Sequence, residues 1–325
     1  MLVLPRTRTL VKSVLSHVVP GLRTVHSYGN ALGTASAEGC YTVFLRQLVA
    51  FHGCTGLGVP AAVAELGPGS SLGTGFAALI AGAEKYYALD LVDHTKPERN
   101  LALFDQVAEL FRRRALIPSS GRHSLRFPDL ERYDFPAFLE LGPASAFEER
   151  VAAIRADIAL GTGQHLEMFA PWADRATIRP QSIDWVFSES VMEHIDDLAG
   201  AYAALGFWLK PSGHASHLID FGSHGVTRDW NGHWALGDRM WTALRGRRPY
   251  LINRQPYAEH LRLARENGFA TVLERRSKRF DGLIPEQFAR RFRDVNDEDA
   301  RSHMVLLISR AADRIASPEL DAAAA

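Results

Sequence analysis

Two groups of residues in this sequence have types and spacings that could support chemistry. The first is Glu65-Leu-Gly-Pro-Gly69, which begins a stretch with four glycines between Gly67 and Gly75. An apolar run precedes these glycines, and the helix-like Phe76-Ala-Ala-Leu-Ile-Ala81 follows them. A strand, a glycine turn and a helix in this order form a corner in which the backbone can approach a nucleotide closely. The stretch therefore predicts a nucleotide or a nucleotide-like cofactor.

The residues around the glycines distinguish the possible cofactors. A dinucleotide corner requires a third glycine three positions after the second, where this chain has Leu72. Glu65 would lie beside the pyrophosphate of NAD, and like charges repel at close range. S-adenosylmethionine carries an ammonium and a sulfonium group and no phosphate, so a carboxylate at the strand end suits it. No Gly-Lys-Ser/Thr sequence follows the turn, which excludes a P-loop.

The second group gathers histidines and a carboxylate near the ends of later strands. His194 follows the fourth predicted strand, and His217, Asp220 and His224 lie at the end of the fifth strand and in the loop beyond it. Such side chains can remove a proton from a hydroxyl group. We predict that His217 is a general base oriented by Asp220, and that His224 or His194 contacts the substrate. Successive strand residues face opposite sides, so His217 and Asp220 can act together only if the strand ends between them.

The same residues could hold a metal ion. His217, Asp220 and His224 would supply two imidazoles and a carboxylate, which are common metal ligands. Three ligands on one strand and its loop are a nonspecific pattern, however, so we predict no metal. His194 could instead cap the helix that it begins or pack on the cofactor.

The order of these motifs resembles a known family, the class I S-adenosylmethionine-dependent methyltransferases. Glu65-Leu-Gly-Pro-Gly69, with Asp90 about twenty residues after the glycine turn, resembles the family's glycine motif and the carboxylate that binds ribose. Ile183-Asp-Trp-Val-Phe-Ser-Glu-Ser-Val-Met-Glu-His-Ile195 resembles its fourth strand and the helix start after it. Leu209-Lys-Pro-Ser-Gly213 resembles the turn before its fifth strand. The resemblance covers roughly residues 57–310.

The resemblance implies a Rossmann-like α/β fold. Its sheet would have seven strands, mostly parallel with the last strand pair antiparallel, and helices on both faces. The cofactor would lie across the carboxyl ends of the strands, where open α/β sheets bind ligands. The implied cofactor-binding residues are Glu65 at the strand end, Gly67 and Gly69 near the methionine portion, Asp90 at the ribose, Ala173 and Asp174 at the adenine, and Ser188 and Glu189 beside the sulfonium.

Composition and charge limit the remaining possibilities. The chain has 325 residues, a formal net charge of zero and a pI near 7.3, which weighs against a nucleic-acid partner. Its two cysteines, Cys40 and Cys54, form no disulfide framework, so we expect a reducing, cytoplasmic location. No apolar run reaches the ~18 residues of a membrane span. A basic amphipathic N-terminal helix, with Arg6, Arg8 and Lys12, could pack on the domain or touch a membrane weakly.

The pattern along the chain predicts one catalytic domain with additions. Residues 1–55 would form an N-terminal helical cap and 56–310 the methyltransferase domain, with insertions at 92–165 and 222–256 and a flexible tail at 311–325. Three of six tryptophans fall in the second insertion, the predicted lid, and aromatic faces suit a sugar acceptor. The segments His217–His224 and Tyr250–Arg254 also resemble methyltransferases of bacterial polysaccharide and glycan pathways.

The sequence therefore predicts an enzyme that uses S-adenosylmethionine to methylate oxygen in a sugar or another small molecule. Ser71 and Leu72 stand where many members have a third glycine, and Ser212 replaces a glycine of the turn before the fifth strand. These departures leave open a cofactor-binding regulator or scaffold without turnover. A nicotinamide-dependent oxidoreductase is the other alternative.

Overall fold

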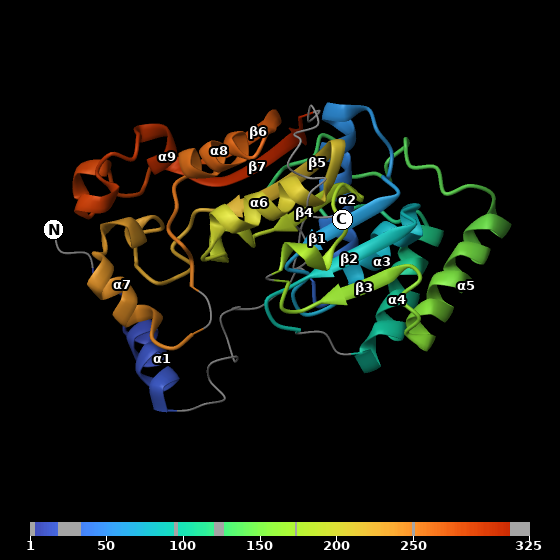
Figure 1. Cartoon of the computed structure of the whole chain (residues 1–325), viewed down its shortest axis with the longest axis horizontal. Helices are drawn as coiled ribbons and strands as arrows, with labels where there is room; N and C mark the ends of the chain where they lie inside the picture. The colour runs from blue at the N-terminus through green and yellow to red at the C-terminus, as the bar shows by residue number, and fades with distance from the viewer. Residues whose placement is uncertain are drawn as a thin grey trace, which may run out of the picture.

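A single seven-stranded sheet forms the centre of the protein (Figure 1). The computed structural model describes residues 4–18, 34–93, 97–119, 127–172, 174–248 and 251–312. The strand order is β3-β2-β1-β4-β5-β7-β6. The strands are β1 (Ala62–Leu66), β2 (Lys85–Leu89), β3 (Leu166–Phe169), β4 (Ile183–Glu189), β5 (Leu209–Asp220), β6 (Phe269–Lys278) and β7 (Ser302–Ala311).

Only β7 runs against its neighbours. The pairs from β3 through β5 are parallel, whereas β7 is antiparallel to both β5 and β6. The predicted mostly parallel sheet of seven strands is confirmed. The chain leaves β1 toward β2 and β3, and then returns to β4 on the other side of β1. This reversal is a topological switch point, outside which open α/β sheets bind ligands.

One face of the sheet is covered by α2 (Ala37–Thr55), α3 (Gly73–Ala81), α4 (Pro97–Arg112) and α5 (Ala144–Leu160). The helix α2 belongs to this core, because Phe51 stacks on Trp185 of β4 with ring centroids 4.9 Å apart. Its apolar residues occur almost all round the helix, which is the pattern of a buried element. The segment that we predicted as a cap, residues 1–55, thus contributes a central helix. The predicted insertion 92–165 likewise contributes α4 and α5 to the same core.

A glycine sets the distance between α3 and β2. A Cβ atom at Gly75 would lie 2.1 Å from Cε1 of Tyr86, so any side chain there would push the helix away from the strand. Close helix–strand packing is the role of the third glycine in dinucleotide corners. Here the fourth glycine of the stretch supplies it, although Leu72 stands at the expected position.

The opposite face is covered by α6 (Leu198–Trp208) and α8 (Tyr257–Glu266). Asp197 is the N-cap of the helix α6, and its side chain accepts a hydrogen bond from the Gly200 N–H group. The helix α8 is followed by Asn267 and then by Gly268, which has a φ of 78°. A glycine after the last turn is a common helix end, and this predicted boundary is confirmed.

The start of β5 differs from the prediction. The sequence predicted a turn at Lys210–Gly213 and a strand from Ala215, whereas β5 begins at Leu209. The pairing with β4 shifts register between Ile183 and Trp185, which accommodates the extra residues. Ser212 adopts a left-handed φ of 62°, a conformation that glycine adopts more easily.

The predicted lid, 222–256, contains η4 (Gly232–Ala235) and α7 (Asp238–Arg245). Trp234 lies in the core and donates its indole N–H to the Arg254 carbonyl at 2.9 Å. The helix α1 (Thr7–Val18) packs beside α7, where the Ser13 hydroxyl donates to the Ala243 carbonyl (Figure 1). No helix among the described residues is long and apolar enough to cross a membrane.

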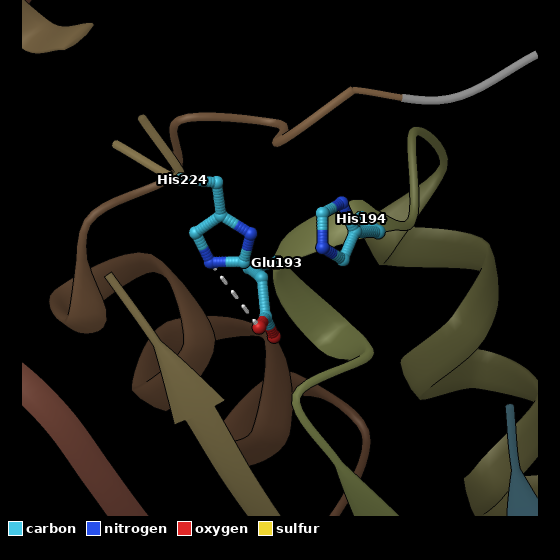
Figure 2. A group of neighbouring side chains, drawn as sticks. All are labelled: Glu193, His194 and His224. Atoms are coloured by element: carbon cyan, nitrogen blue, oxygen red, sulfur yellow. Dashed lines mark ion pairs between the residues drawn. The ribbon is translucent and has the colours of Figure 1, made fainter. Parts of the chain in front are cut away.

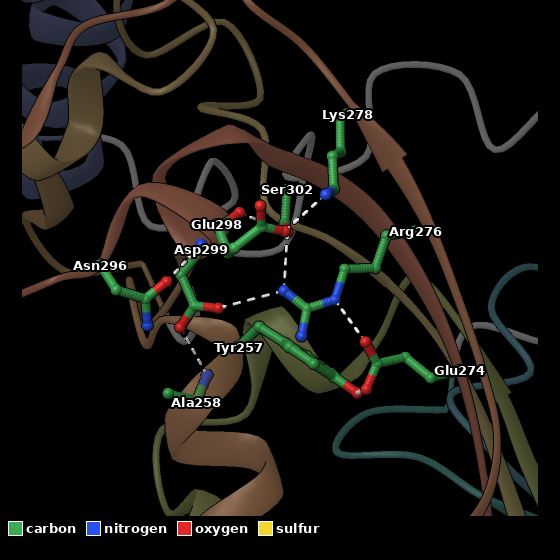
Figure 3. Close-up of polar contacts among 9 residues, drawn as sticks. All are labelled: Tyr257, Ala258, Glu274, Arg276, Lys278, Asn296, Glu298, Asp299 and Ser302. Carbon is green, nitrogen blue, oxygen red and sulfur yellow. Dashed lines mark hydrogen bonds and ion pairs between the residues drawn. The ribbon is translucent and has the colours of Figure 1, made fainter.

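A polar network joins the last helix, α9 (Asp297–Arg301), to α8 and β6 (Figure 3). Asp299 accepts hydrogen bonds from the Ala258 N–H at 2.8 Å and from Arg276 at 3.4 Å. Arg276 also pairs with Glu274 on β6. The short 3-10 helices η5 (Pro285–Gln287) and η6 (Arg290–Phe292) precede α9. The network fixes the start of α8 against the edge of the sheet.

Candidate active site

A cavity of about 580 Å³ opens at the carboxyl ends of β1 and β2, beside the start of α6. It therefore lies at the topological switch point. Its lining comprises Gly67, Asp90, Leu91, Trp172, Asp174, Arg175, Val191, His194, Ile195, Asp196, Asp197, Gly200, Ala201, Ala203 and Ala204. Four of the residues singled out from the sequence thus meet in one cavity: Gly67, Asp90, Asp174 and His194.

The glycine turn brings bare backbone to the cavity wall. Gly67 has a φ of 66°, and its N–H donates to the Leu89 carbonyl at 2.7 Å. A Cβ atom on Gly67 would lie 2.5 Å from Cγ2 of Val191. Gly69, with a φ of 75°, lies against Thr34 and is not among the lining residues. The turn thus needs glycine for its conformation and, at Gly67, for space.

Two carboxylates stand at the cavity on separate loops. Asp90 follows β2, and its Oδ1 accepts a hydrogen bond from the Leu91 N–H at 2.7 Å. Asp174 precedes η2 (Arg175–Thr177) and accepts from the Ala176 N–H at 2.8 Å. Ala173, predicted to meet the adenine, lies outside the described residues. Local turns therefore hold both carboxylates at the mouth of the sheet.

The carboxyl group of Glu65 is buried beneath the cavity. Glu65 is only 1% exposed and accepts a hydrogen bond from the Tyr86 hydroxyl. Burial raises its pKa to about 8, and the charges of Glu189 and Asp90 act in the same direction. Glu65 therefore faces α3 and the core, and it does not line the cavity.

Ser188 and Glu189 end β4 and are held by Gln47 of α2. The Gln47 side-chain amide donates to the Ser188 carbonyl at 3.2 Å and to Glu189 Oε2 at 3.1 Å. The Ser216 hydroxyl on β5 donates to the same glutamine. Burial raises the pKa of Glu189 to about 8. One helix side chain thus ties together the ends of two neighbouring strands.

His217 does not meet Asp220. It is 1% exposed, and its Nδ1 lies 2.8 Å from the Ser188 hydroxyl, on the face of β5 that packs against α6 and α8. Burial lowers its pKa to about 3. The strand continues through Asp220, so the two side chains point to opposite faces. The condition for a His217–Asp220 pair is not met, and the predicted pairing is corrected.

Asp220 instead meets His224, whose ring lies near Glu193 and His194 (Figure 2). His224 Nε2 lies 3.3 Å from Asp220 Oδ2 and 3.9 Å from Glu193 Oε1. Burial alone would raise the pKa of Asp220 and lower that of His224. The hydrogen bond between them reverses both effects, so the pKa of Asp220 is lowered and that of His224 is raised. The two groups therefore favour a charged pair.

His194 connects this cluster to the cavity. Its ring centroid lies 4.9 Å from that of His224, and the residue lines the cavity wall. Burial, followed by the charge of His224, lowers its pKa to about 3. His194, His224 and Asp220 are thus brought together as predicted, while His217 is separated from them.

Comparison with known proteins finds only distant structural likenesses. No protein-family model and no curated protein matches the chain. A solved S-adenosylmethionine-dependent methyltransferase from Mesorhizobium loti is similar at 15% identity and a TM-score of 0.40, over 85% of this chain and 98% of that one. Phosphoethanolamine N-methyltransferase 2 from Haemonchus contortus is similar at 12% identity and a TM-score of 0.40, over 85% and 56%. Likenesses this distant indicate neither a substrate nor site residues.

The order of the strands, with β7 alone reversed and the cavity at the switch point, is decisive for the architecture. The chain has the seven-stranded, Rossmann-like sheet that the resemblance to the class I methyltransferases implied. The glycine turn and Asp90 lie at the carboxyl ends of its strands, and His194 lies just after β4.

Two residues of the site were not singled out from the sequence. Glu193 adjoins His194 in the quoted motif and is buried beside His224. Its place in a Glu-His pair just after the fourth strand was an available signal. Gln47 lies in a helix more than a hundred residues before the strands that it joins. A glutamine among apolar residues of a buried helix is a weak signal, because its partners depend on packing.

Proposed function

We propose that this protein is an S-adenosylmethionine-dependent methyltransferase that acts on oxygen in a sugar or another small molecule. The observation that carries the proposal is the convergence of Gly67 and Asp90 on one cavity at the switch point. A bare backbone approach and a carboxylate at the next strand end are the two parts that an adenosine-containing cofactor requires there.

The residues present fit this cofactor better than a dinucleotide. Any side chain at Gly67 would collide with Val191. Because glycine has no side chain, its backbone stays accessible at the cavity. Glu65 and Glu189 lie at the ends of β1 and β4, outside the cavity lining, and burial raises the pKa of each to about 8. A cationic ligand near such groups favours their charged forms, whereas a pyrophosphate opposes them. When bound, S-adenosylmethionine supplies a methyl group that its sulfonium activates for transfer.

Each part of the cavity has a proposed role in holding the cofactor. Asp90 would accept hydrogen bonds from the ribose hydroxyls, and Gly67 and Gly69 would let the main chain follow the methionine portion. Asp174 would lie near the adenine. Ser188 and Glu189, fixed by Gln47, would form the floor on the side of the sulfonium.

The cluster of Asp220 and His224 provides the acceptor side of the site. The bound cofactor would supply the methyl group to an acceptor oxygen, so the residues of this chain need only hold that oxygen and remove its proton. The hydroxyl proton would pass to the pair of Asp220 and His224, whose side chains lie 3.3 Å apart. Aligning the acceptor and removing its proton are the two contributions that the protein must make.

The lid does not supply an open aromatic platform for a sugar. Trp230, Trp234 and Trp241 are 7%, 0% and 9% exposed. Trp234 packs in the core of the domain, Trp230 packs against His303, and Trp241 packs within the lid, so none of them supports a glycan acceptor. The proposal of a hydroxyl-bearing acceptor therefore depends on Asp220 and His224. Sugars are one class of such acceptors.

Calorimetric titration with S-adenosylhomocysteine and with NADH tests the cofactor. We expect micromolar binding of S-adenosylhomocysteine, at least tenfold weaker binding in Asp90→Ala, and no binding of NADH. Asp134→Ala is the matched control, since Asp134 is exposed and pairs only with the nearby Arg132 among the contacts of the described residues. Binding of NADH in place of S-adenosylhomocysteine would replace the proposal with an oxidoreductase.

A panel of hydroxyl, amine and carbon acceptors then tests turnover. Formation of S-adenosylhomocysteine is measured with wild type and with Asp220→Asn. We expect turnover with hydroxyl compounds and its loss in the variant. Cofactor binding without turnover on any acceptor would favour a regulator, and turnover only with amines would contradict the choice of oxygen.

A further inference from the structure

Glu193, His194 and His224 form a cluster beside the cofactor cavity. None of the three is among the residues proposed to contact the cofactor. Glu193 and His194 lie in η3 (Met192–His194), and His224 lies in the loop after β5. One possible ligand atom from each lies within 4.8 Å of the others, and Figure 2 shows the three side chains around a common space. Two imidazoles and one carboxylate are a donor set that first-row transition metals accept. We propose that this triad binds one divalent transition-metal ion, with Zn²⁺ as its simplest probe.

The burial of Glu193 is the second observation that points to a cation. Glu193 is 4% exposed, and neither of its carboxylate oxygens has a hydrogen-bond partner among the described residues. His224 Nε2 lies 3.9 Å from its Oε1. Burying a charged carboxylate is unfavourable unless the group is protonated or a cation or a metal compensates for it. A metal ion in the space between the three side chains removes this cost.

The backbone that carries the triad is held in place from the lid. The Asn253 side-chain amide donates to the carbonyls of Met192 and Ile195, each at 2.8 Å, and the Asn253 N–H donates to the Glu193 carbonyl at 2.6 Å. These bonds fix both ends of η3. Metal sites depend on such supporting contacts, because ligands that are already oriented bind more tightly.

The geometry requires only side-chain adjustment. Metal–ligand bonds of ~2.0–2.2 Å place ligand atoms about 3–4 Å apart, somewhat closer than the 4.8 Å limit of this cluster. His194 is half-buried and the His224 side chain is 28% exposed, so neither ring is fully enclosed. The backbone of His224 has a left-handed φ of 48°, an unfavourable conformation that is typical of functional positions.

The role of the ion rests on the proposed function. His194 lines the cofactor cavity, so an ion on this triad would lie where the acceptor must enter. It would bind the acceptor oxygen and lower the pKa of the hydroxyl group. Asp220 lies outside the triad and beside His224, and it would take the proton. The sequence predicted no metal because His217, Asp220 and His224 form a nonspecific set of ligands on one strand and its loop, and Glu193 was not among the candidates.

Metal binding is tested on the full chain without any cofactor. The protein is stripped with a chelator, dialysed, and titrated with ZnCl₂ and separately with MgCl₂ in a calorimeter. We expect one Zn²⁺ per chain with micromolar or tighter affinity, and Mg²⁺ binding at least a hundredfold weaker. Glu193→Gln and His224→Gln should each weaken Zn²⁺ binding at least tenfold. Thermal unfolding in chelator establishes that each variant is folded.

His303→Gln is the matched control, because His303 lies 4.0 Å from Asp220 but outside the triad. Its Zn²⁺ affinity should equal that of wild type. Absence of stoichiometric Zn²⁺ binding, equal affinity in the triad variants, or an equal loss in His303→Gln would each overturn the proposal. Titration of the same stripped protein with S-adenosylhomocysteine separates the two proposals, since cofactor binding without Zn²⁺ binding refutes only the metal site.

Discussion

The hydroxyl oxygen of Ser188 lies 2.8 Å from Nδ1 of His217, in the layer between the sheet and α6. Ser188 and His217 are also paired in register, so two neighbouring strands are joined by their side chains as well as by their backbones. This contact explains why a histidine of the fifth strand is retained in the core. His217 therefore contributes to stability, whereas His194 and His224 are the histidines at the proposed site.

Replacing His217 should therefore affect folding more than cofactor binding. We expect His217→Ala to lower the free energy of unfolding by about 2–4 kcal/mol, because it leaves a void and deprives the Ser188 hydroxyl of its partner. His217→Asn should recover part of this loss. Urea unfolding measures both variants. If His217→Ala were as stable as wild type yet lost turnover, His217 would be the general base after all.

Mild acid should destabilise the protein through its buried histidines. Burial lowers the pKa values of His217 and His260 to about 3 from an ordinary value near 6.5. Between these pH values the unfolded chain binds more protons than the folded one, so the free energy of unfolding decreases as the pH falls below about 6.5. Each histidine contributes about 1.4 kcal/mol per pH unit in this window and nothing above it.

The variant His260→Gln isolates one of these contributions. Urea unfolding at pH 7.5 and 5.5 should show a smaller pH dependence in the variant, by about 1.4 kcal/mol over that interval. His52→Gln is the control, since its ring lies near the surface and stacks on Phe138. An unchanged pH dependence in His260→Gln would show that His260 is protonated in the folded protein.

Two helical glycines, Gly75 in α3 and Gly53 in α2, lead to opposite predictions for their alanine variants. In Gly75→Ala the new Cβ would lie 2.1 Å from Cε1 of Tyr86, so α3 must move and the free energy of unfolding should fall by about 2–4 kcal/mol. Gly53 lies in α2 with no atom within 4 Å of its Cβ position, so Gly53→Ala should stabilise by about 0.5–1 kcal/mol. Denaturant unfolding of both proteins distinguishes packing from helix propensity.

Gly67→Ala should weaken binding of S-adenosylhomocysteine at least tenfold. Alanine is strained at a φ of 66°, and its Cβ would lie 2.5 Å from Cγ2 of Val191. The double variant with Val191→Ala restores space but leaves the strain, so it should recover only part of the affinity. Calorimetry measures each protein. Full affinity in Gly67→Ala would exclude close backbone contact between this turn and the cofactor.

Local sequence patterns predicted the parts of this protein that depend on local physics. The strand before Gly67, the carboxylate at Asp90 and the helix end at Gly268 are each determined by residues within a few positions. The alternation of strands and helices also predicted a parallel sheet with its site at the carboxyl ends. These features follow from backbone preferences and from the connection rules of α/β folds.

The remaining features depend on contacts between distant segments. Whether His217 faced a cavity or the core depended on the register of β5, and a strand that continues through Asp220 reverses the prediction. Gln47 could be placed only when α2 was known to pack on β4. Glu193 gained meaning from its distance to His224, which belongs to another strand and loop.

The position of α2 has a consequence for synthesis of the protein on the ribosome. Gln47 bonds to residues that follow it by 141 and 169 positions, and Phe51 of the same helix stacks on β4. A nascent chain therefore exposes this apolar helix long before the strands that cover it have emerged, and such surfaces promote aggregation. We expect chains that stop before Ile183 to aggregate or to bind chaperones, whereas chains that extend past Asp220 can bury the helix.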